Sequence, residues 1–269
     1  MRIPALTLTL LFAAFLTIIH ADQKCSYHKW KVYKGVALLQ HSGGSAYIYS
    51  SKYVKVDADG APNAYHPDDI GLHCTKGIGF KGLDCPANAG YPNTKWWKNA
   101  ILPNPDNPQK AFVQKSGEFA GYFVSCTTLK DASKSDADPA KYVDSRNIPY
   151  VVFPGKFSKI KGTGRMGDIG YAINLKTKTM SPFVVAEVGP SDAELGEMSI
   201  ALAKALGGNN PNPRTGTGVP KGMILYIIFP NSSRTYKWPL SLASIAEHSA
   251  TLLNDVGGID RAISCMDAF

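Results

Sequence analysis

Two glutamates near the middle of the chain have the residue type and spacing that acid/base hydrolysis requires. Glu187 ends the apolar run 183–186, and Glu197 follows it across a Gly-Pro turn at residues 189–190. A carboxylate in so apolar a run costs free energy unless it faces a cleft or a partner. Two carboxylates on opposite sides of a short loop can face each other across a cleft, as hydrolysis of a glycosidic bond requires.

The neighbourhood of Glu197 leaves its role open. The segment 197–206 has a helical composition, and the glycines at 207–208 would end that helix. Glu197 could then be a first-turn glutamate that the helix dipole stabilises. As a catalytic pair, we expect Glu197 to be the general acid and Glu187 the general base. The reverse assignment also remains open, because the sequence does not show which carboxyl is drier.

Asp168 is a further candidate, as a substrate-binding residue. It opens a predicted strand after the glycine-rich, basic loop 161–167. From that position it could bind a substrate ammonium group or orient a water molecule. It could also simply pair with Arg165, which would make its role structural.

Three more aspartates, Asp57, Asp59 and Asp84, are candidates to line a cleft and bind cationic substrate groups. Asp57 and Asp59 belong to the segment 57–60, whose composition is typical of a turn, so turn formation is the alternative interpretation. Calcium binding is a weaker interpretation, because residues 61–62 are Ala and Pro and offer no side-chain oxygen. We expect no metal ion and no cofactor.

Short apolar or alternating runs predict strands that would position these carboxylates. These runs lie at residues 47–49, 53–56, 121–126, 148–153, 168–175, 183–188 and 222–229. A helix is predicted at 241–256 with Gly257 as its cap, and the Pro-, Gly- and Asn-rich stretch 71–108 predicts surface loops. Many short strands and few helices favour a mainly β fold with a β-barrel or sandwich core.

The first 21 residues are typical of a secretory signal. Arg2 is followed by the apolar run 6–19, and Ala21 is a small residue at the expected cleavage point. The apolar run is too short to span a membrane comfortably. The remaining 248 residues (269 − 21) predict a single domain at 22–269. We therefore expect a secreted, extracellular protein without a membrane anchor.

Cysteine content and charge restrict the protein's environment and partners. Five cysteines in a secreted chain favour disulfides, with Cys74–Cys85 and Cys25–Cys265 as the pairings we consider and one thiol left over.

The formal net charge is +8. The lysines are scattered without a dense run, which fits solubility better than nucleic-acid binding. We expect a monomer with no nucleic-acid partner.

Several segments occur together in an order that carries a family resemblance. They are residues 55–67, 82–84, 88–90, 121–125, 142–145, 148–152, 167–168, 189–190, 196–197 and 199–203. In this order, over roughly residues 47–230, they resemble the fungal-type chitosanases of glycoside hydrolase family 75. Each fragment alone is a weak signal, and their joint order is specific.

The resemblance implies an endo-acting hydrolase that cleaves chitosan, the β-1,4-linked polymer of glucosamine, with inversion. It also implies a barrel-like core and, more specifically, a double-psi β-barrel. The family's two essential carboxylates map onto Glu187 and Glu197. This chain departs from the family pattern in two ways: Glu187 stands where the family usually has Asp, and the loop 191–195 is one residue longer.

These departures and the positive charge keep other functions open. Loss of Arg2 with the signal lowers the net charge from +8 to +7 (8 − 1), and a protein of this charge should repel a polycation, which favours a less charged substrate such as chitin, partly acetylated chitosan or peptidoglycan. A non-catalytic polysaccharide-binding protein and a basic secreted effector are the alternatives to an enzyme. The pair Trp96-Trp97 could stack on sugar rings or belong to the core.

Overall fold

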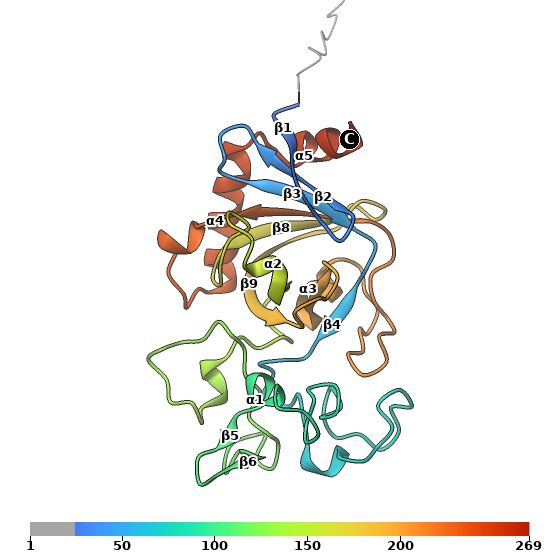
Figure 1. The fold of residues 1–269 in the computed structure, drawn as a ribbon, viewed down its shortest axis with the longest axis vertical. Helices are drawn as coiled ribbons and strands as arrows, with labels where there is room; N and C mark the ends of the chain where they lie inside the picture. The colour runs from blue at the N-terminus through green and yellow to red at the C-terminus, as the bar shows by residue number, and fades with distance from the viewer. Residues whose placement is uncertain (1–24, 269) are drawn as a thin grey trace, which may run out of the picture.

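The computed structural model describes residues 25–268, which form a large mixed sheet with helices on both faces and a loop-rich part at one end (Figure 1). The predicted secretory signal at residues 1–21 lies outside the described residues. Within 25–268, no helix is long and apolar enough to cross a lipid bilayer.

Nine strands form the main sheet in the order β1-β2-β3-β11-β8-β9-β7-β10-β4. Their bounds are β1 Tyr27–Tyr33, β2 Val36–His41, β3 Tyr47–Ser51, β4 Lys55–Asp57, β7 Tyr150–Pro154, β8 Ile169–Asn174, β9 Met180–Gly189, β10 Glu197–Ser199 and β11 Ile224–Phe229. Neighbouring strands are antiparallel except β7–β9 and β10–β4, which are parallel. The predicted mainly β class is confirmed. The strand order ends at β1 and β4, so backbone pairing among the described strands does not close the sheet into a barrel.

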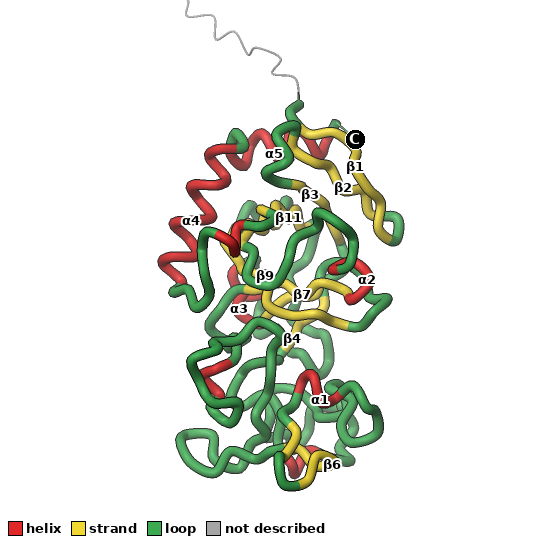
Figure 2. The backbone as a smooth tube through the Cα atoms, turned by 60° about the vertical axis from the view of Figure 1, so that its left-hand side comes forward, coloured by secondary structure: helices red, strands yellow, loops and turns green. Residues whose placement is uncertain are grey.

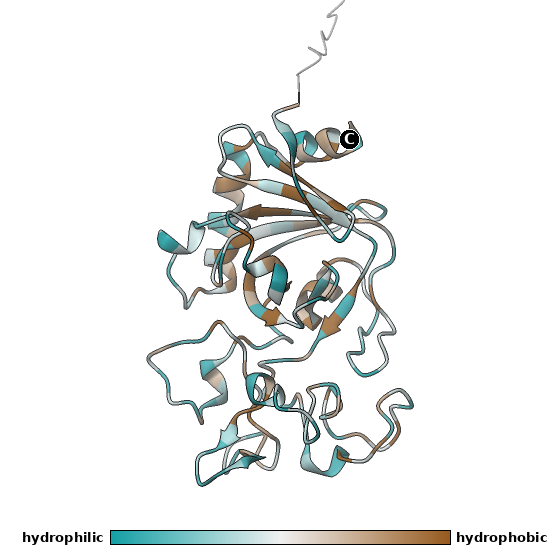
Figure 3. Ribbon diagram, viewed as in Figure 1, coloured by the Kyte–Doolittle hydropathy of each residue, from teal (hydrophilic) through white to brown (hydrophobic). Residues whose placement is uncertain are grey.

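Both faces of the sheet are buried, which explains its continuously apolar strands. In β11, Ile224, Tyr226 and Ile228 pack into one core cluster, and the alternate residues pack into the other. Helices α2 (Gly155–Ser158) and α3 (Ile200–Ala205) contribute to the first cluster, and α4 (Leu242–Asp255) and α5 (Gly258–Asp267) to the second. Figure 2 shows α4 and α5 as long red segments on one side of the sheet, and Figure 3 shows apolar colour along the central strands.

Helix α4 forms where the sequence predicts a helix. The Ser241 hydroxyl caps its N-terminus by accepting a hydrogen bond from the backbone N–H of Ser244, with an N···O distance of 3.1 Å. At the other end, Gly257 adopts a left-handed conformation with φ of 90°, which only glycine reaches at little cost. Ile245 and Leu253 are buried beneath the helix, so one apolar face holds α4 against the sheet.

The loop-rich part, residues 58–145, lies below β4 in Figure 1. Its regular elements are short: the 3₁₀ turns η1 (Pro67–Asp69) and η2 (Pro139–Lys141), the helix α1 (Trp97–Ala100), and the hairpin of β5 (Pro103–Asn104) and β6 (Asn107–Ala111). A third 3₁₀ turn, η3 (Ser232–Arg234), follows β11.

The strand predicted at 121–126 is wrong. This segment makes only isolated bridges, at Phe123 and Ser125. Its backbone hydrogen bonds go to different partners, since Phe123 N–H donates to the carbonyl of Tyr65 and Val124 N–H donates to that of Phe112. Without one extended neighbour, the segment cannot join a ladder, although its composition is strand-like.

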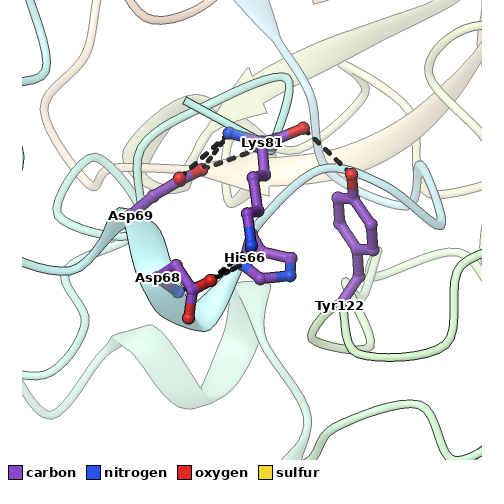
Figure 4. Close-up of polar contacts among 6 residues, drawn as sticks. His66, Asp68, Asp69, Lys81 and Tyr122 are labelled. Atoms are coloured by element: carbon purple, nitrogen blue, oxygen red, sulfur yellow. Dashed lines mark hydrogen bonds and ion pairs between the residues drawn. The ribbon is translucent and has the colours of Figure 1, made fainter. Parts of the chain in front are cut away.

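Polar contacts, some from the buried Asp69 and others at the surface, fix the loop 66–85 (Figure 4). The Asp69 carboxylate accepts hydrogen bonds from the backbone N–H groups of Lys81, at 3.0 Å, and Gly82, at 2.8 Å. The Tyr122 hydroxyl donates to the Lys81 carbonyl at 3.1 Å, and the Lys81 ammonium pairs with Asp68. These contacts hold the end of the loop, which carries Asp84, against the rest of the molecule.

Two disulfides form, and both predicted pairings are confirmed. Cys74–Cys85 closes the loop just described, and Cys25–Cys265 joins residues 240 positions apart, next to β1 and in α5. The remaining Cys126 is a buried free thiol.

Candidate functional site

A cavity of about 750 Å³ lies between one end of the sheet and the loop-rich part. Its walls come from β4, β7, β9 and β10 and from the loops at 84–100 and 213–216. Five of the six predicted site residues line it: Asp57, Asp59, Asp84, Glu187 and Glu197. Residues that are up to 140 positions apart in the sequence (197 − 57) therefore contribute carboxyl groups to one cavity.

A β-bulge turns Glu187 toward this cavity. On β9, Val185 pairs with Val151 of the parallel strand β7, whereas the next residue of β7, Val152, pairs with Glu187. Ala186 is the extra residue of the bulge. Its carbonyl accepts a hydrogen bond from Leu129 N–H at 2.8 Å instead of one from the neighbouring strand. Because a bulge reverses the alternation of side chains, Glu187 shares its face of the sheet with Val152.

Thr128 holds the Glu187 carboxyl group. Its backbone N–H donates to Oε2 at 2.7 Å, and its hydroxyl forms a short hydrogen bond with Oε1. The backbone N–H of Val188 also donates to Oε1, at 2.7 Å. Burial raises the pKa of Glu187 to about 8, although these hydrogen bonds oppose the shift. The side chain is thus fixed in position and is mainly protonated at neutral pH.

Glu197 lies on a strand, so the prediction of a helix beginning at this residue is wrong. Residues 197–199 form β10, which pairs in parallel with β4, and Glu197 is opposite Lys55. The helix α3 begins only at Ile200, where the Ser199 hydroxyl caps it. Glu197 is therefore not a first-turn residue, and the helix dipole does not explain its presence.

The strand register places Glu187 and Glu197 on either side of one residue. Val152 pairs with Glu187 on β9. On the other side of β7, Val151 pairs with Met198 of the antiparallel strand β10, so Glu197 lies opposite Val152. Adjacent strands are about 4.8 Å apart, which places the two glutamate backbones about 10 Å apart. Both side chains line the same cavity across Val152.

Lys55 provides a charge partner for Glu197. Its Nζ atom is 2.9 Å from Oε1 of Glu197, and half of the lysine side chain is exposed. The two glutamates thus have different surroundings, one with buried neutral donors and the other with a cation.

Asp57, which is buried, and Asp59, which is partly exposed, form an acidic pair in the wall of the cavity. Asp57 accepts hydrogen bonds from the Tyr150 hydroxyl at 3.0 Å and from Asp59 N–H at 2.9 Å, and Asp59 accepts one from the Tyr65 hydroxyl at 2.7 Å. Burial, followed by the charge of Glu197, raises the pKa of Asp57 to about 7. Burial and then Asp57 raise the pKa of Asp59 well above its ordinary value. Both aspartates shape a turn, as their alternative interpretation predicts, and both also line the cavity.

Asp84 and Trp96 belong to the opposite, loop-rich wall. Asp84 accepts hydrogen bonds from Asn88 Nδ2 at 2.8 Å and from Cys85 N–H at 2.7 Å, and burial raises its pKa to about 6. Trp96 is exposed and lines the cavity, whereas Trp97 is buried in the core. Trp97 therefore belongs to the core, whereas stacking of a sugar ring on Trp96 stays a prediction.

Asp168 lies apart from the other predicted residues and does not line the cavity. It is fully buried, and its carboxylate accepts hydrogen bonds from the backbone N–H groups of Arg165, Asn231 and Ser233 at 2.8–2.9 Å. These contacts join the loop before β8 to the turn after β11. The Arg165 guanidinium donates instead to Asn231 Oδ1.

Sequence reasoning missed three cavity-related residues. Thr128 and Lys55 contact the two glutamates, and Arg214 lines the cavity from a distant loop. Lys55 was detectable in principle, because its position two residues before Asp57 on a strand puts both on one face. No local pattern marks Thr128 or Arg214. Among residues 25–268, no group of three or more His, Cys, Asp or Glu side chains is placed to hold a metal ion.

No protein-family model and no curated protein sequence matches this chain. The geometry of the cavity is therefore the principal guide to function.

Proposed function

We propose that this chain is a secreted, endo-acting glycoside hydrolase that cleaves the β-1,4 linkages of chitosan with inversion. The observation that carries the proposal is the placement of Glu187 and Glu197 on either side of Val152 in one cavity. Carboxyl groups of an inverting pair stand about 6.5–9.5 Å apart, which leaves room for a water molecule and the sugar. Backbones about 10 Å apart, with side chains entering one cavity, are compatible with that separation.

The surroundings of the pair favour Glu187 as the acid and Glu197 as the base. This is the reverse of the assignment preferred from the sequence. A general acid must hold a proton near neutral pH, and the raised pKa of Glu187, about 8, provides it. A general base must accept a proton from water, and Glu197 lines the cavity with its Oε1 atom 2.9 Å from the Lys55 ammonium. Glu187 would protonate the leaving oxygen while Glu197 removes a proton from the attacking water.

The remaining walls suit an amino-sugar polymer. Asp57, Asp59 and Asp84 supply carboxyl oxygens that can accept hydrogen bonds from the ammonium groups of glucosamine, and a bound ammonium would favour the ionised form of each. The exposed Trp96 offers an indole face on which a sugar ring can stack. Salt screens the more distant lysines, which weakens the repulsion that the net positive charge exerts on a polycation. The two disulfides suit an oxidising compartment, which supports secretion.

Reducing-end release from soluble, highly deacetylated chitosan at mildly acidic pH tests the proposal. Glu187→Gln and Glu197→Gln should each lower kcat by at least about a thousandfold if each supplies a proton-transfer step. The matched control is Glu194→Gln, since Glu194 lies in the same loop and pairs with Lys34, outside the cavity. Wild-type protein that releases no reducing ends, or Gln variants that remain active, would refute the proposal.

A carbohydrate-binding protein without catalysis is the second candidate. The observation that favours it is that both oxygens of Glu187 already accept backbone hydrogen bonds, as in a structural carboxylate. In that case the wild-type protein would bind chitosan oligomers without cleaving them. Glu187→Gln and Glu197→Gln would then change affinity only, and calorimetry would measure that change.

A further inference from the structure

Arg214 is the feature of the cavity that a site for glucosamine alone does not explain. The other charged lining residues are five carboxyl groups and Lys55, which pairs with Glu197. Among residues 25–268, no carboxylate lies within ion-pair distance of the Arg214 guanidinium. Its Nε atom is buried and has no hydrogen-bond acceptor. A buried guanidinium N–H without an acceptor is costly unless a ligand or water supplies one.

Two loops hold the guanidinium in a defined orientation. It stacks over the Phe80 ring, with 4.6 Å between the guanidinium carbon and the ring centroid, and its Nη1 donates to the Gly82 carbonyl at 3.2 Å. Phe80 and Gly82 belong to the loop that Asp69 and the Cys74–Cys85 disulfide fix. On its own loop, Arg214 N–H donates to Asn212 Oδ1 at 3.0 Å. Because the guanidinium is held before any ligand binds, its free N–H groups present a fixed donor surface.

This arrangement suits an uncharged sugar substituent that carries an acceptor oxygen. An ammonium group beside Arg214 would be repelled by the like charge and would offer no acceptor. The carbonyl oxygen of an acetamido group accepts hydrogen bonds and carries no charge. The opposite requirement holds beside Asp57 and Asp59, whose carboxyl oxygens can accept hydrogen bonds from an ammonium, whereas Asp84 already feels the charge of Arg214, which lowers its pKa against the effect of burial. One cavity therefore contains a position for an acetylated unit and positions for free glucosamine units.

We propose that Arg214 binds the acetamido carbonyl of an N-acetylglucosamine unit, so that the cavity selects partly acetylated chains over fully deacetylated ones. This inference rests on the proposed function and specifies its substrate. It also offers a reason why a protein of charge +8 acts on a polymer of amino sugars, because acetylation lowers the positive charge of the chain.

Binding measurements test the proposal independently of catalysis. Two glucosamine pentamers serve as probes, one fully deacetylated and one with a single internal N-acetyl group, and calorimetry gives their affinities for the Glu197→Gln protein. We expect the acetylated pentamer to bind about tenfold more tightly, and Arg214→Gln in that background to remove most of this ratio, as loss of one charged hydrogen bond predicts. Arg165→Gln is the matched control, because Arg165 contacts Asn231 away from the cavity.

Product analysis of partly acetylated chitosan adds a second readout. With wild-type protein, mass spectrometry should find acetylated units enriched at either the reducing or the non-reducing ends of the products. With Arg214→Gln this enrichment should be smaller. Equal affinities for the two pentamers, or an affinity ratio that Arg214→Gln leaves unchanged, would overturn the role of Arg214. Absence of any cleavage by the wild type would instead refute the proposed hydrolase, and the affinity ratio would still decide what Arg214 binds.

Discussion

The environments of Glu187 and Glu197 show how two residues of one type acquire different chemical properties. Glu187 is surrounded by apolar residues and by uncharged donors from Thr128 and Val188, so its proton is retained to about pH 8. Glu197 has an ammonium group at 2.9 Å, from Lys55. Both features depend on neighbours that are distant in sequence. The sequence placed the two residues at one cleft, and the structure shows both lining one cavity, but no local pattern indicated the neighbours that raise the pKa of Glu187 or pair with Glu197.

Thr128→Val should lower kcat while it changes KM little. The substitution removes the hydroxyl that contacts Glu187 Oε1 but keeps the backbone N–H and the side-chain shape. Loss of one hydrogen bond that positions the acid should reduce kcat about tenfold. Thr128→Ser, which keeps the hydroxyl, should restore most of the rate, and Thr179→Val at an exposed threonine pair is the control. An unchanged kcat in Thr128→Val would show that the contact does not position the acid.

The buried carboxyl groups should make the fold less stable as pH rises from 5 to 8. Burial raises the pKa of Asp84 to about 6, of Asp57 to about 7 and of Glu187 to about 8. The folded state thus binds more protons than the unfolded chain, whose carboxyl groups titrate near pH 4. Their contribution is complete below about pH 4 and is lost as pH rises through the folded pKa values.

Urea unfolding between pH 5 and pH 9 measures this dependence. The free energy of unfolding should fall across the range, and Glu187→Gln should flatten the curve near pH 8, because it removes the group that titrates there. Glu247→Gln, at an exposed position on α4, should leave the slope unchanged. A stability that rises from pH 5 to 8 would contradict the raised pKa values.

Among the elements, β9 and β10 determine the cavity more than any other pair. The bulge in β9 turns Glu187, and the parallel pairing of β10 with β4 keeps residues 197–199 extended. The helix predicted from 197 fails because helix propensity does not account for a strand partner 142 residues away (197 − 55). The predictions of β11 and α4 succeeded because each has a strong local pattern that its packing reinforces.

Gly189→Ala tests how closely the end of β9 approaches Glu197, one of the two proposed catalytic residues. A Cβ atom at this position would lie 3.1 Å from Glu197 Oε2 and 2.9 Å from Val152 Cγ1. The added methyl group should displace the Glu197 carboxylate and lower kcat/KM by at least about tenfold, while circular dichroism shows a retained fold. Gly43→Ala is the control, since its nearest neighbour is the exposed His41 side chain at 3.4 Å. Full activity of Gly189→Ala would argue against Glu197 acting from its position in the structure.

At the scale of the whole molecule, the sheet and the loop-rich part are stabilised differently. The sheet has two apolar core clusters, one on each face. The loop-rich part has few regular elements and depends on buried polar contacts such as those of Asp69 and on the Cys74–Cys85 disulfide. Composition predicted the loops. It did not predict the polar contacts that fix them, because no local sequence pattern indicates which residues will pair.

Removal of each disulfide should destabilise the fold to a different extent. The bond between Cys25 and Cys265 spans 240 residues and that between Cys74 and Cys85 spans 11. Chain-entropy estimates give losses of about 5 and about 3 kcal/mol, respectively, when each pair is replaced by serines. Urea unfolding of the two double-serine variants measures both. If the Cys74/Cys85 variant lost more stability than the Cys25/Cys265 variant, the entropic explanation would be wrong.

The same long-range bond has a practical consequence for presentation of the protein. Cys25, just before β1, and Cys265, in α5, have Cα atoms 5.3 Å apart. The strand order has β1 at one end and β4, which lines the cavity, at the other (Figure 1). A tether near either cysteine, to a resin, a fused module or a particle, would therefore be attached at the end of the sheet away from the cavity.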